Sequence, residues 1–354
     1  MRLSRWTAWA CHGLAAVVLA ALAVAYGVSD RHWLGAAFGL WPPWFWSPGI
    51  LVLVVLGHRA WRWPFTLALL AATILFCLTF TEGLLLLRRP PTEATAPFDE
   101  AHARLAADAG SASGSATAGF PLRVVSWNLA GPGAGPEAVL AKMARYRPDL
   151  CFVQEVWHGE RDLPRAARDA CFRGYDWFAT PDCGLLSRFP IRRREVLDLG
   201  QGLRAALGEI ALPSSGAVTC ISVHLRLYPL RLAVWDRAVR DESRRAKNER
   251  SEAMRRLEAV VRSHARGGGS LIVAGDWNVP ASAKSLRPLR HHLSDAFLAG
   301  GSGWGNTMTD EFPVSRIDAI FVSSGFNVVR CVAHPTGISD HRLVEAALWL
   351  EANK

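Results

Sequence analysis

The 354-residue chain lacks the cysteine spacing of a zinc protein and the cysteine count of a disulfide-rich one. Its seven cysteines include no CxxC pair, which argues against a structural zinc site. Five of them, an odd number, lie beyond residue 89, so a complete disulfide framework is not expected. One pair, Cys171 with Cys183, would close a loop if that part of the chain lies outside the cytoplasm. No internal repeat is present.

Charge is almost absent from three N-terminal stretches. Residues 8–28 and 34–57 carry none, although Trp41-Pro42-Pro43 interrupts the second, and residues 65–87 carry only one acid. Each stretch supplies roughly the 20 residues that span a bilayer. We therefore predict a membrane domain over residues 1–89 with three transmembrane helices. A signal peptide is the weaker interpretation of the first stretch, because two more apolar stretches follow it.

Arginines predict the orientation of this membrane domain. Those that favour a cytoplasmic N-terminus are Arg2, Arg5, Arg59 and Arg62. Three passes then place the rest of the chain outside the cytoplasm. Arg88 and Arg89, directly after the third stretch, argue for the opposite orientation.

The remainder of the chain divides into a linker and a globular domain. Residues 90–119 are dominated by Pro, Ala, Ser and Gly, so we expect a flexible linker. Residues 120–354 are ordinary globular sequence, long enough for one substantial core. The formal charge of +9 is not by itself a sign of nucleic-acid binding. Arginines beside the apolar stretches supply much of it.

Six apolar stretches of the globular part read as strands with polar residues at or beside one end. These residues are Asn128, Glu155, His224, the pair Asp276 and Asn278, Asp318, and the pair Asp340 and His341. Any one of them has an ordinary explanation as a turn residue or a solvated strand end. Together they supply the groups of one metal-assisted phosphoester site: oxygen ligands for a hard cation, a carboxylate for a water, and a histidine oriented by a carboxylate.

The local geometry of the stretch Ser270–Pro280 predicts that two of these polar residues share one pocket. In a strand, residues two apart face the same side. We therefore expect Asp276 and Asn278 to face one pocket, while Trp277 faces the other way and packs.

These motifs resemble the endonuclease/exonuclease/phosphatase (DNase I-like) superfamily, and the resemblance covers residues 122 to about 350. The motifs are SWN at 126–128, QE at 154–155, LLSRFPI at 185–191, SVHL at 222–225, GDWN at 275–278, RIDAIFVS at 316–323 and SDHRLV at 339–344. The resemblance implies a four-layer α/β sandwich, in which two mixed sheets lie face to face with helices outside. With the N-terminal stretches, the expected fold class is this sandwich preceded by three transmembrane helices.

The resemblance also implies a metal site. Glu155 would be the main ligand, with Asn128 beside it and Asp340 in the same network. The implied cofactor is Mg²⁺, with Mn²⁺ as an alternative.

Five further residues would carry the chemistry by resemblance. Asp276 would hold or activate the attacking water, and Asn278 would contact the scissile phosphate. His341 would bind the phosphate, oriented by Asp318. His224 matches a histidine of the DNase I, sphingomyelinase and inositol 5-phosphatase branches, whereas the abasic-site repair branch has a tyrosine there.

The carboxylate that pairs with His224 cannot be located from the sequence. Glu209 is a candidate only because it lies near in the chain.

The sequence thus predicts a membrane-tethered, metal-dependent phosphoesterase with a lean toward a lipid headgroup or other small phosphoester. The alternatives are a DNase I-like nuclease and an inactive binding module on the same fold. Residues 226–256 mix basic and acidic side chains, whereas a DNA groove favours a cleaner basic stripe. The expected partners are a phosphoester substrate, nucleic acid included, and the lipid bilayer. No obligate protein partner is evident.

Overall fold

The computed structural model describes residues 5–39, 41–58, 63–80, 88, 92–107, 119–130, 135–156, 163, 165–213, 216–228, 233 and 235–351. They form two compact units. One unit contains the N-terminal helices with residues 228–247 and 282–284. The other contains the two sheets.

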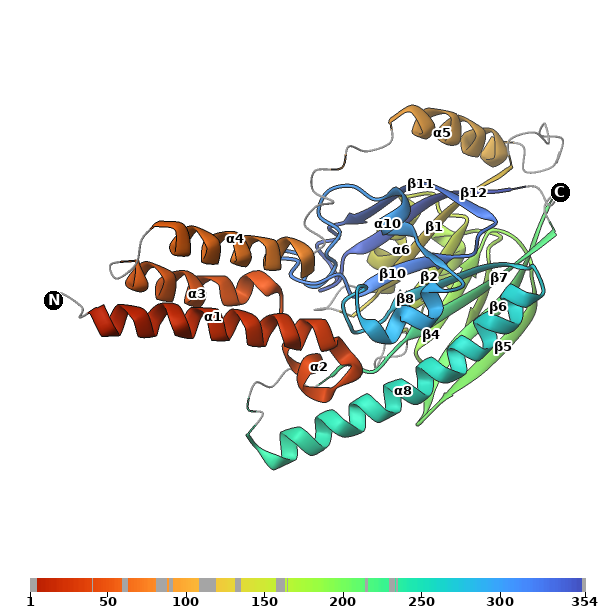
Figure 1. The fold of residues 1–354 in the computed structure, drawn as a ribbon. Helices are drawn as coiled ribbons and strands as arrows, with labels where there is room; N and C mark the ends of the chain where they lie inside the picture. Colours follow the sequence, from red (N-terminus) through yellow and green to blue (C-terminus); the bar gives the residue numbers. More distant parts are fainter. Residues whose placement is uncertain are drawn as a thin grey trace. The chain divides into compact units, whose positions relative to one another are not determined.

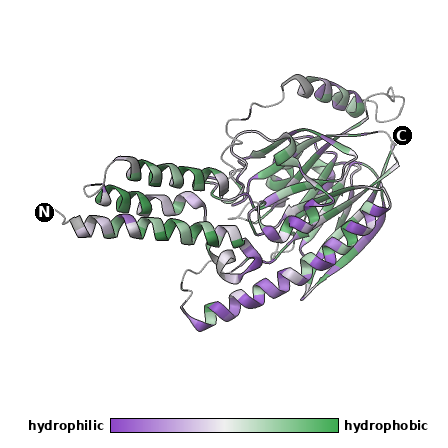
Figure 2. Ribbon diagram, in the orientation of Figure 1, coloured by the Kyte–Doolittle hydropathy of each residue, from purple (hydrophilic) through white to green (hydrophobic). Residues whose placement is uncertain are grey.

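The N-terminal unit is built from apolar helices that pack on one another. Its elements are α1 (Arg5–Val28), the short 3-10 helix η1 (Ser29–Arg31), α2 (Trp33–Gly39), α3 (Pro43–Gly57) and α4 (Trp63–Phe80). Figure 2 shows how largely hydrophobic α1, α3 and α4 are. Their common core includes Ala15 and Leu22 of α1, Ile50 of α3 and Phe76 of α4.

The prediction of three membrane-spanning helices was wrong for the part of the chain that the structure describes. One helical stretch there, Trp9–Arg31, is long and apolar enough to cross a membrane, while the apolar helices Pro43–Gly57 and Phe65–Thr79 are shorter. The second predicted span is broken because Pro42 is extended (φ −66°, ψ 144°) and Pro43 starts a new helix. That helix of 15 residues is about 22 Å long, less than the roughly 30 Å of a hydrocarbon core. Residues 81–87 of the third predicted span lie outside the described residues.

The second unit is a sandwich of two mixed six-stranded sheets, as the sequence predicted (Figure 1). The first sheet has the order β11-β12-β1-β2-β4-β3, with β1 (Phe120–Asn128), β2 (Leu150–Gln154), β3 (Asp176–Ala179), β4 (Cys183–Ser187), β11 (Phe326–His334) and β12 (Leu343–Leu350). The second has the order β5-β6-β7-β8-β10-β9, with β5 (Ile191–Gly200), β6 (Leu203–Leu212), β7 (Gly216–His224), β8 (Ser270–Asp276), β9 (Ser294–Asp295) and β10 (Asp318–Val322).

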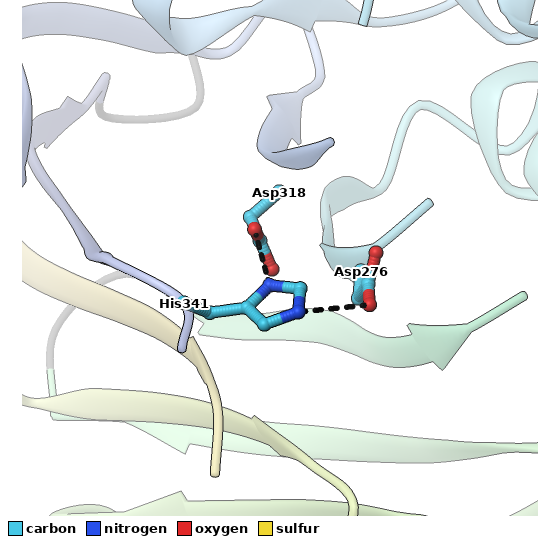
Figure 3. Close-up of side chains that lie close together, drawn as sticks. All are labelled: Asp276, Asp318 and His341. Carbon is cyan, nitrogen blue, oxygen red and sulfur yellow. Dashed lines mark hydrogen bonds and ion pairs between the residues drawn. The ribbon is translucent and has the colours of Figure 1, made fainter. Parts of the chain in front are cut away.

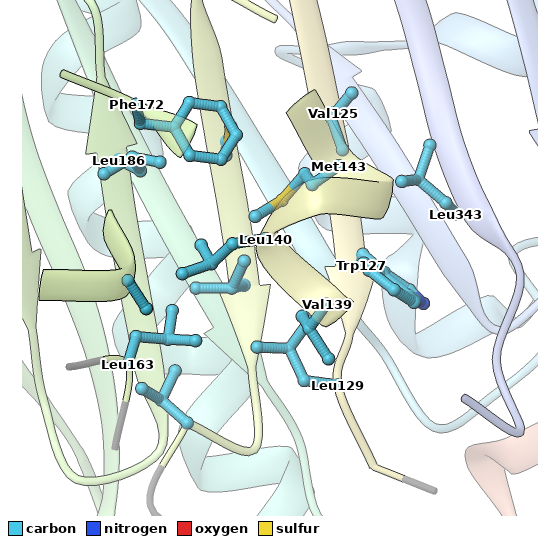
Figure 4. Packing of buried hydrophobic residues seen from close by; sticks show 14 residues of the cluster. Val125, Trp127, Leu129, Val139, Leu140, Met143, Leu163, Phe172, Leu186 and Leu343 are labelled. Carbon is cyan, nitrogen blue, oxygen red and sulfur yellow. The ribbon is translucent and has the colours of Figure 1, made fainter. Parts of the chain in front are cut away.

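Helices cover the outer faces of the sandwich. Leu140 and Met143 of α6 (Pro136–Ala144) pack with Phe172, which follows α7 (Arg165–Cys171), onto the first sheet (Figure 4). The remaining elements are α8 (Arg237–Arg266), η3 (Lys284–Leu286), α9 (Arg287–Arg290) and α10 (Ala296–Gly300). Helix α8 ends just before Gly267.

Helix α5 (Thr92–Ala107) lies inside the segment 90–119 that we expected to be a flexible linker. It packs on the first sheet through Phe98, which is fully buried against Val329 and Ala347. The Nε2 atom of His102 on the same helix lies 2.8 Å from the Asp149 carboxylate. The composition of this segment does not predict a helix, because tertiary contacts hold it, among them buried Phe98, the His102–Asp149 pair and the ion pair of Asp99 with Arg123. The domain boundaries drawn from the sequence remain predictions.

The pairing suggested for Cys171 and Cys183 is absent, since both are free cysteines. Cys183 begins β4 and is completely buried, whereas Cys171 ends α7 and packs on the outer helical layer. The two side chains therefore belong to different layers of the fold.

Candidate active site

The topology of the two sheets brings the predicted polar residues to one edge of the sandwich. Asn128 ends β1 and pairs in register with Gln154 of the parallel strand β2, so that Glu155 follows beside it. His224 ends β7 in register with Asp276, which ends the parallel strand β8. Asp318 begins the antiparallel strand β10 directly opposite Asp276. Paired strand ends thus place five carboxylate, amide and imidazole groups at this edge.

Asp318, His341 and Asp276 form a chain of groups across this edge (Figure 3). Nδ1 of His341 lies 2.8 Å from Oδ2 of Asp318, and its Nε2 lies 3.9 Å from Oδ2 of Asp276. All three residues are buried. Burial alone would lower the pKa of His341, but the charges of Asp318, Asp276 and Asp340 and the hydrogen bond to Asp318 raise it to about 10. At neutral pH His341 is therefore a buried cation with its Nε2–H directed toward Asp276.

Asp276 sits between two histidines. Burial and the charge of Asp318 raise the pKa of Asp276. The charges of His341 and His224 and a hydrogen bond from the backbone N–H of Asn278 oppose this rise. Oδ2 of Asp276 lies 3.6 Å from Nε2 of His224. This carboxylate is therefore shared by the two imidazoles.

His224 is held by a carboxylate that sequence analysis missed. Its Nδ1 lies 2.8 Å from Oδ2 of Asp182, in the turn before β4 of the opposite sheet. Burial lowers the pKa of His224, but the hydrogen bond to Asp182 and the charges of Asp276, Asp182 and Glu155 raise it to about 9. Glu209 is not the partner, because it lies on β6 opposite Thr219, far along the strand from His224.

The sequence gives only a weak signal for the role of Asp182. The stretch Thr180-Pro181-Asp182 reads as a turn, and the Thr180 hydroxyl accepts a hydrogen bond from the backbone of Cys183. The carbonyl of Asp182 also accepts a hydrogen bond from the backbone N–H of Glu155 at 2.8 Å. The turn is thus tied to β2, although only the folded structure joins it to His224.

Asn128 connects the two halves of the site. Its side-chain nitrogen donates to Oε1 of Glu155 and to Oδ2 of Asp276, both at 3.0 Å. The hydroxyl of Ser339 donates to the Asn128 carbonyl at 2.8 Å and accepts from the backbone N–H of His341. The loop that carries His341 is therefore fixed to the end of β1.

The turn after β8 explains the sequence Gly275-Asp276-Trp277-Asn278. A Cβ on Gly275 would lie 1.8 Å from the Val223 carbonyl oxygen of the neighbouring strand, so only glycine fits there. Trp277 is buried and packs edge to face on Phe321 with 5.1 Å between ring centroids, as expected.

The side chains of Asp276 and Asn278 do approach the same group. The Asn278 amide nitrogen lies 3.2 Å from Nε2 of His224 and donates to the Leu225 carbonyl at 2.8 Å. Strand alternation is not the cause, because β8 ends at Asp276 and Asn278 has a positive φ of 50°. A backbone turn, stabilised by the 2.8 Å hydrogen bond from the Asn278 N–H to Asp276, returns the amide to the site.

Two arrangements of these residues could hold a cation. Asp276, Asp318 and His341 offer ligand atoms within 4.8 Å of one another. A histidine must lose its proton to bind a metal, however, and His341 already bonds to Asp318. Glu155, Asn128 and Asp340 carry oxygen atoms, the ligands that a hard cation prefers, and the Asn128 Oδ1 already accepts a hydrogen bond from the Ala130 N–H. The Oδ1 atoms of Asp340 and Asp318 are buried and form no hydrogen bond among the described residues.

The fold and the arrangement of the site define the chain as a DNase I-like α/β sandwich with two carboxylate-held histidines at one edge. It belongs to the endonuclease/exonuclease/phosphatase family, whose model matches residues 125–341. No curated protein matches the chain.

Solved structures share the fold at low identity. An endonuclease/exonuclease/phosphatase from Bacteroides vulgatus is 16% identical with a TM-score of 0.51, covering 66% of this chain and 100% of that one. A family protein from Bacteroides thetaiotaomicron is 19% identical with a TM-score of 0.51, covering 65% and 95%. A mannosyl-6-phosphatase from the same organism is 20% identical with a TM-score of 0.50, covering 64% and 99%.

Proposed function

We propose that the chain is a membrane-tethered hydrolase of phosphoric esters that depends on a divalent cation. The observation that carries this proposal is the buried carboxylate of Asp276, which lies 3.6 Å from His224 and 3.9 Å from His341. Two imidazolium groups around one carboxylate supply positive charge for a phosphate and a base for water within a single pocket. Membership in the family supports phosphoester hydrolysis in general.

Each protein group has a role in the proposed reaction. Asp276 orients the attacking water and accepts its proton. His341, kept protonated by Asp318, donates its Nε2–H to the phosphate oxygens as their negative charge grows. His224, protonated and held by Asp182, donates a proton to the leaving oxygen. Asn278 holds a further phosphate oxygen.

A divalent cation fits the remaining oxygen donors. Glu155, Asn128 and Asp340 would hold it, and Mg²⁺ is the ion that such a set prefers, with Mn²⁺ as an alternative. Such a cation supplies Lewis-acid stabilisation of the phosphoryl group.

For the substrate, we favour a lipid headgroup or other small phosphoester over duplex DNA. Helix α8 alternates charges and forms ion pairs within itself, such as Arg256 with Glu252, so it presents no uniform basic stripe. The Bacteroides phosphatase acts on a mannosyl 6-phosphate, so a phosphomonoester is also compatible with this fold. A DNase I-like nuclease is the second candidate.

For the topology, we propose that the catalytic unit lies outside the cytoplasm. Arg2 and Arg5 precede the apolar residues 8–28 and favour a cytoplasmic N-terminus. The single candidate span, Trp9–Arg31, then places the rest of the chain outside. A phosphatase reporter fused after Lys354, active only when exported, tests this placement; activity of a cytoplasm-specific reporter there would contradict it.

The decisive assay uses the purified full chain with and without Mg²⁺. Bis(p-nitrophenyl) phosphate, p-nitrophenyl phosphate, phosphatidylcholine vesicles and plasmid DNA are compared. We expect Mg²⁺-dependent turnover of the small esters or the lipid that exceeds turnover of DNA. Preferential cleavage of DNA favours the nuclease, and no turnover of any substrate favours the inactive binding module.

A further inference from the structure

Exposed apolar side chains gather on one loop beside the site. Trp304 and Phe312, on the segment between α10 and β10, are 37% and 67% exposed. The indole N–H of Trp304 donates to the carbonyl of Pro313, next to Phe312, at 2.9 Å. We call Trp304 and Phe312 the apolar rim.

The loop that carries the apolar rim is fixed to the catalytic loop. Met308 pairs with Ser315 across the loop and also with His341. The Asp310 carboxylate accepts hydrogen bonds from the backbone N–H groups of Thr336 and Gly337, both at 2.7 Å. The aromatic tip is therefore held rigidly in an exposed position, which costs free energy in water unless an apolar partner covers it.

The start of the catalytic unit is bound to α10, the helix that precedes this loop. The Arg88 guanidinium donates to the carbonyls of Leu298 at 2.7 Å and Ala299 at 2.9 Å. Along the chain, only residues 81–87 separate Arg88 from the end of the apolar helix α4 at Phe80.

We propose that the apolar rim contacts the surface of a zwitterionic lipid bilayer and so holds the mouth of the catalytic site at the membrane. This inference rests on the proposed function and adds to it that the substrate is a phosphoester presented by lipids. Aromatic side chains at headgroup level are typical of membrane interfaces. Exposed Glu311 beside Phe312 disfavours a polyanion such as nucleic acid, which is why the proposed bilayer is zwitterionic.

Photocrosslinking tests the contact directly. The full chain is placed in phosphatidylcholine nanodiscs with p-benzoylphenylalanine at position 312, where the side chain is exposed and the replacement resembles phenylalanine. The matched control carries the same group at Val196 of β5, which is 47% exposed outside the rim. We expect lipid adducts at position 312 and none at position 196.

Three outcomes would overturn the proposal: no lipid adduct at position 312, equal adducts at both positions, or adducts to an added single-stranded oligonucleotide in place of lipid. Turnover of bis(p-nitrophenyl) phosphate is measured in the same samples. Turnover without lipid adducts refutes the membrane contact of the rim but not the proposed hydrolase activity. Lipid adducts without turnover refute the proposed hydrolase activity but not the membrane contact.

Discussion

The two histidines of the site have the same local geometry in different surroundings. Each has its Nδ1 atom 2.8 Å from a carboxylate and its Nε2 atom facing Asp276. The side chains of His341 and its partner Asp318 are 6% and 0% exposed, whereas those of His224 and its partner Asp182 are 15% and 32% exposed.

The difference in exposure suits the two histidine–carboxylate pairs to different roles. A charge pair shielded from water acts with little screening, which suits the stabilisation of charge on a phosphate. A pair near the surface exchanges protons with solvent, which suits the protonation of a leaving oxygen. We therefore expect Asp318 and Asp182 to differ in what their loss costs.

Of the two histidine–carboxylate pairs, the buried one should show the larger effect when it is broken. We expect Asp318→Asn to lower kcat by roughly 10³- to 10⁴-fold, because the amide no longer keeps His341 charged and oriented. Steady-state kinetics on bis(p-nitrophenyl) phosphate measure the loss, with circular dichroism as a check on folding. A folded variant within tenfold of wild type would mean that the buried pair is only structural.

A smaller loss should follow from Asp182→Asn. We expect kcat to fall by about 10- to 10²-fold, since water can replace part of this exposed hydrogen bond. Activity that requires protonated His224 is lost as the pH rises through its pKa of about 9. Removing the Asp182 charge lowers that pKa, so the alkaline decline should begin at lower pH in the variant.

Glu209→Gln is the matched control for this experiment, because Glu209 is a carboxylate on the neighbouring strand without a partner role toward His224. Its pH profile should overlay that of wild type. A profile of Asp182→Asn that also overlays wild type would remove His224 from the proton-transfer step.

The smallest effect on turnover should come from a third histidine–carboxylate pair, outside the site. His102 and Asp149 are both buried, and 2.8 Å separates Nε2 from the carboxylate. We expect His102→Ala to destabilise the fold by about 1–3 kcal/mol through the loss of this bond, with kcat unchanged. Thermal denaturation and kinetics are compared with Arg104→Ala on the exposed face of α5. A selective loss of kcat would show that the pair does more than hold α5.

The proposed role of Glu155 as a metal ligand is tested by Glu155→Gln. We expect it to abolish Mg²⁺-dependent hydrolysis while the fold persists, because an amide does not replace a carboxylate at a hard cation. Titration with Mg²⁺ and thermal denaturation measure the two effects. Undiminished turnover with native stability would exclude Glu155 as a ligand.

Local patterns were enough to predict the strands and the polar residues at their ends. An apolar strand was predicted beside Asp340 and His341, and β12 is observed there as Leu343–Leu350. Asp182 escaped prediction because its pairing with His224 joins a turn of one sheet to a strand of the other, which no local pattern records.

Local sequence patterns carry no information on tertiary contacts or turn geometry, which explains the errors at α5 and Asn278. Helix α5 contains Pro97 and only two large apolar residues, Phe98 and Leu105, and it is stable because tertiary contacts bury Phe98. The positive φ of Asn278 is a property of the turn rather than of strand alternation. Sequence patterns indicated polar residues that the structure gathers at one edge of the sandwich, and the backbone geometry determines how they meet.

The central claim is that Asp276 is the shared carboxylate of a metal-dependent phosphoesterase. Its most direct test is the Mg²⁺-dependent turnover of bis(p-nitrophenyl) phosphate by the full chain, compared with Asp276→Asn, Asn278→Ala and the double variant. We predict that Asp276→Asn loses at least about 10²-fold in kcat, and that the double variant loses less than the product of the two single losses. Near-normal turnover in folded Asp276→Asn, or single losses that simply multiply, would contradict the account.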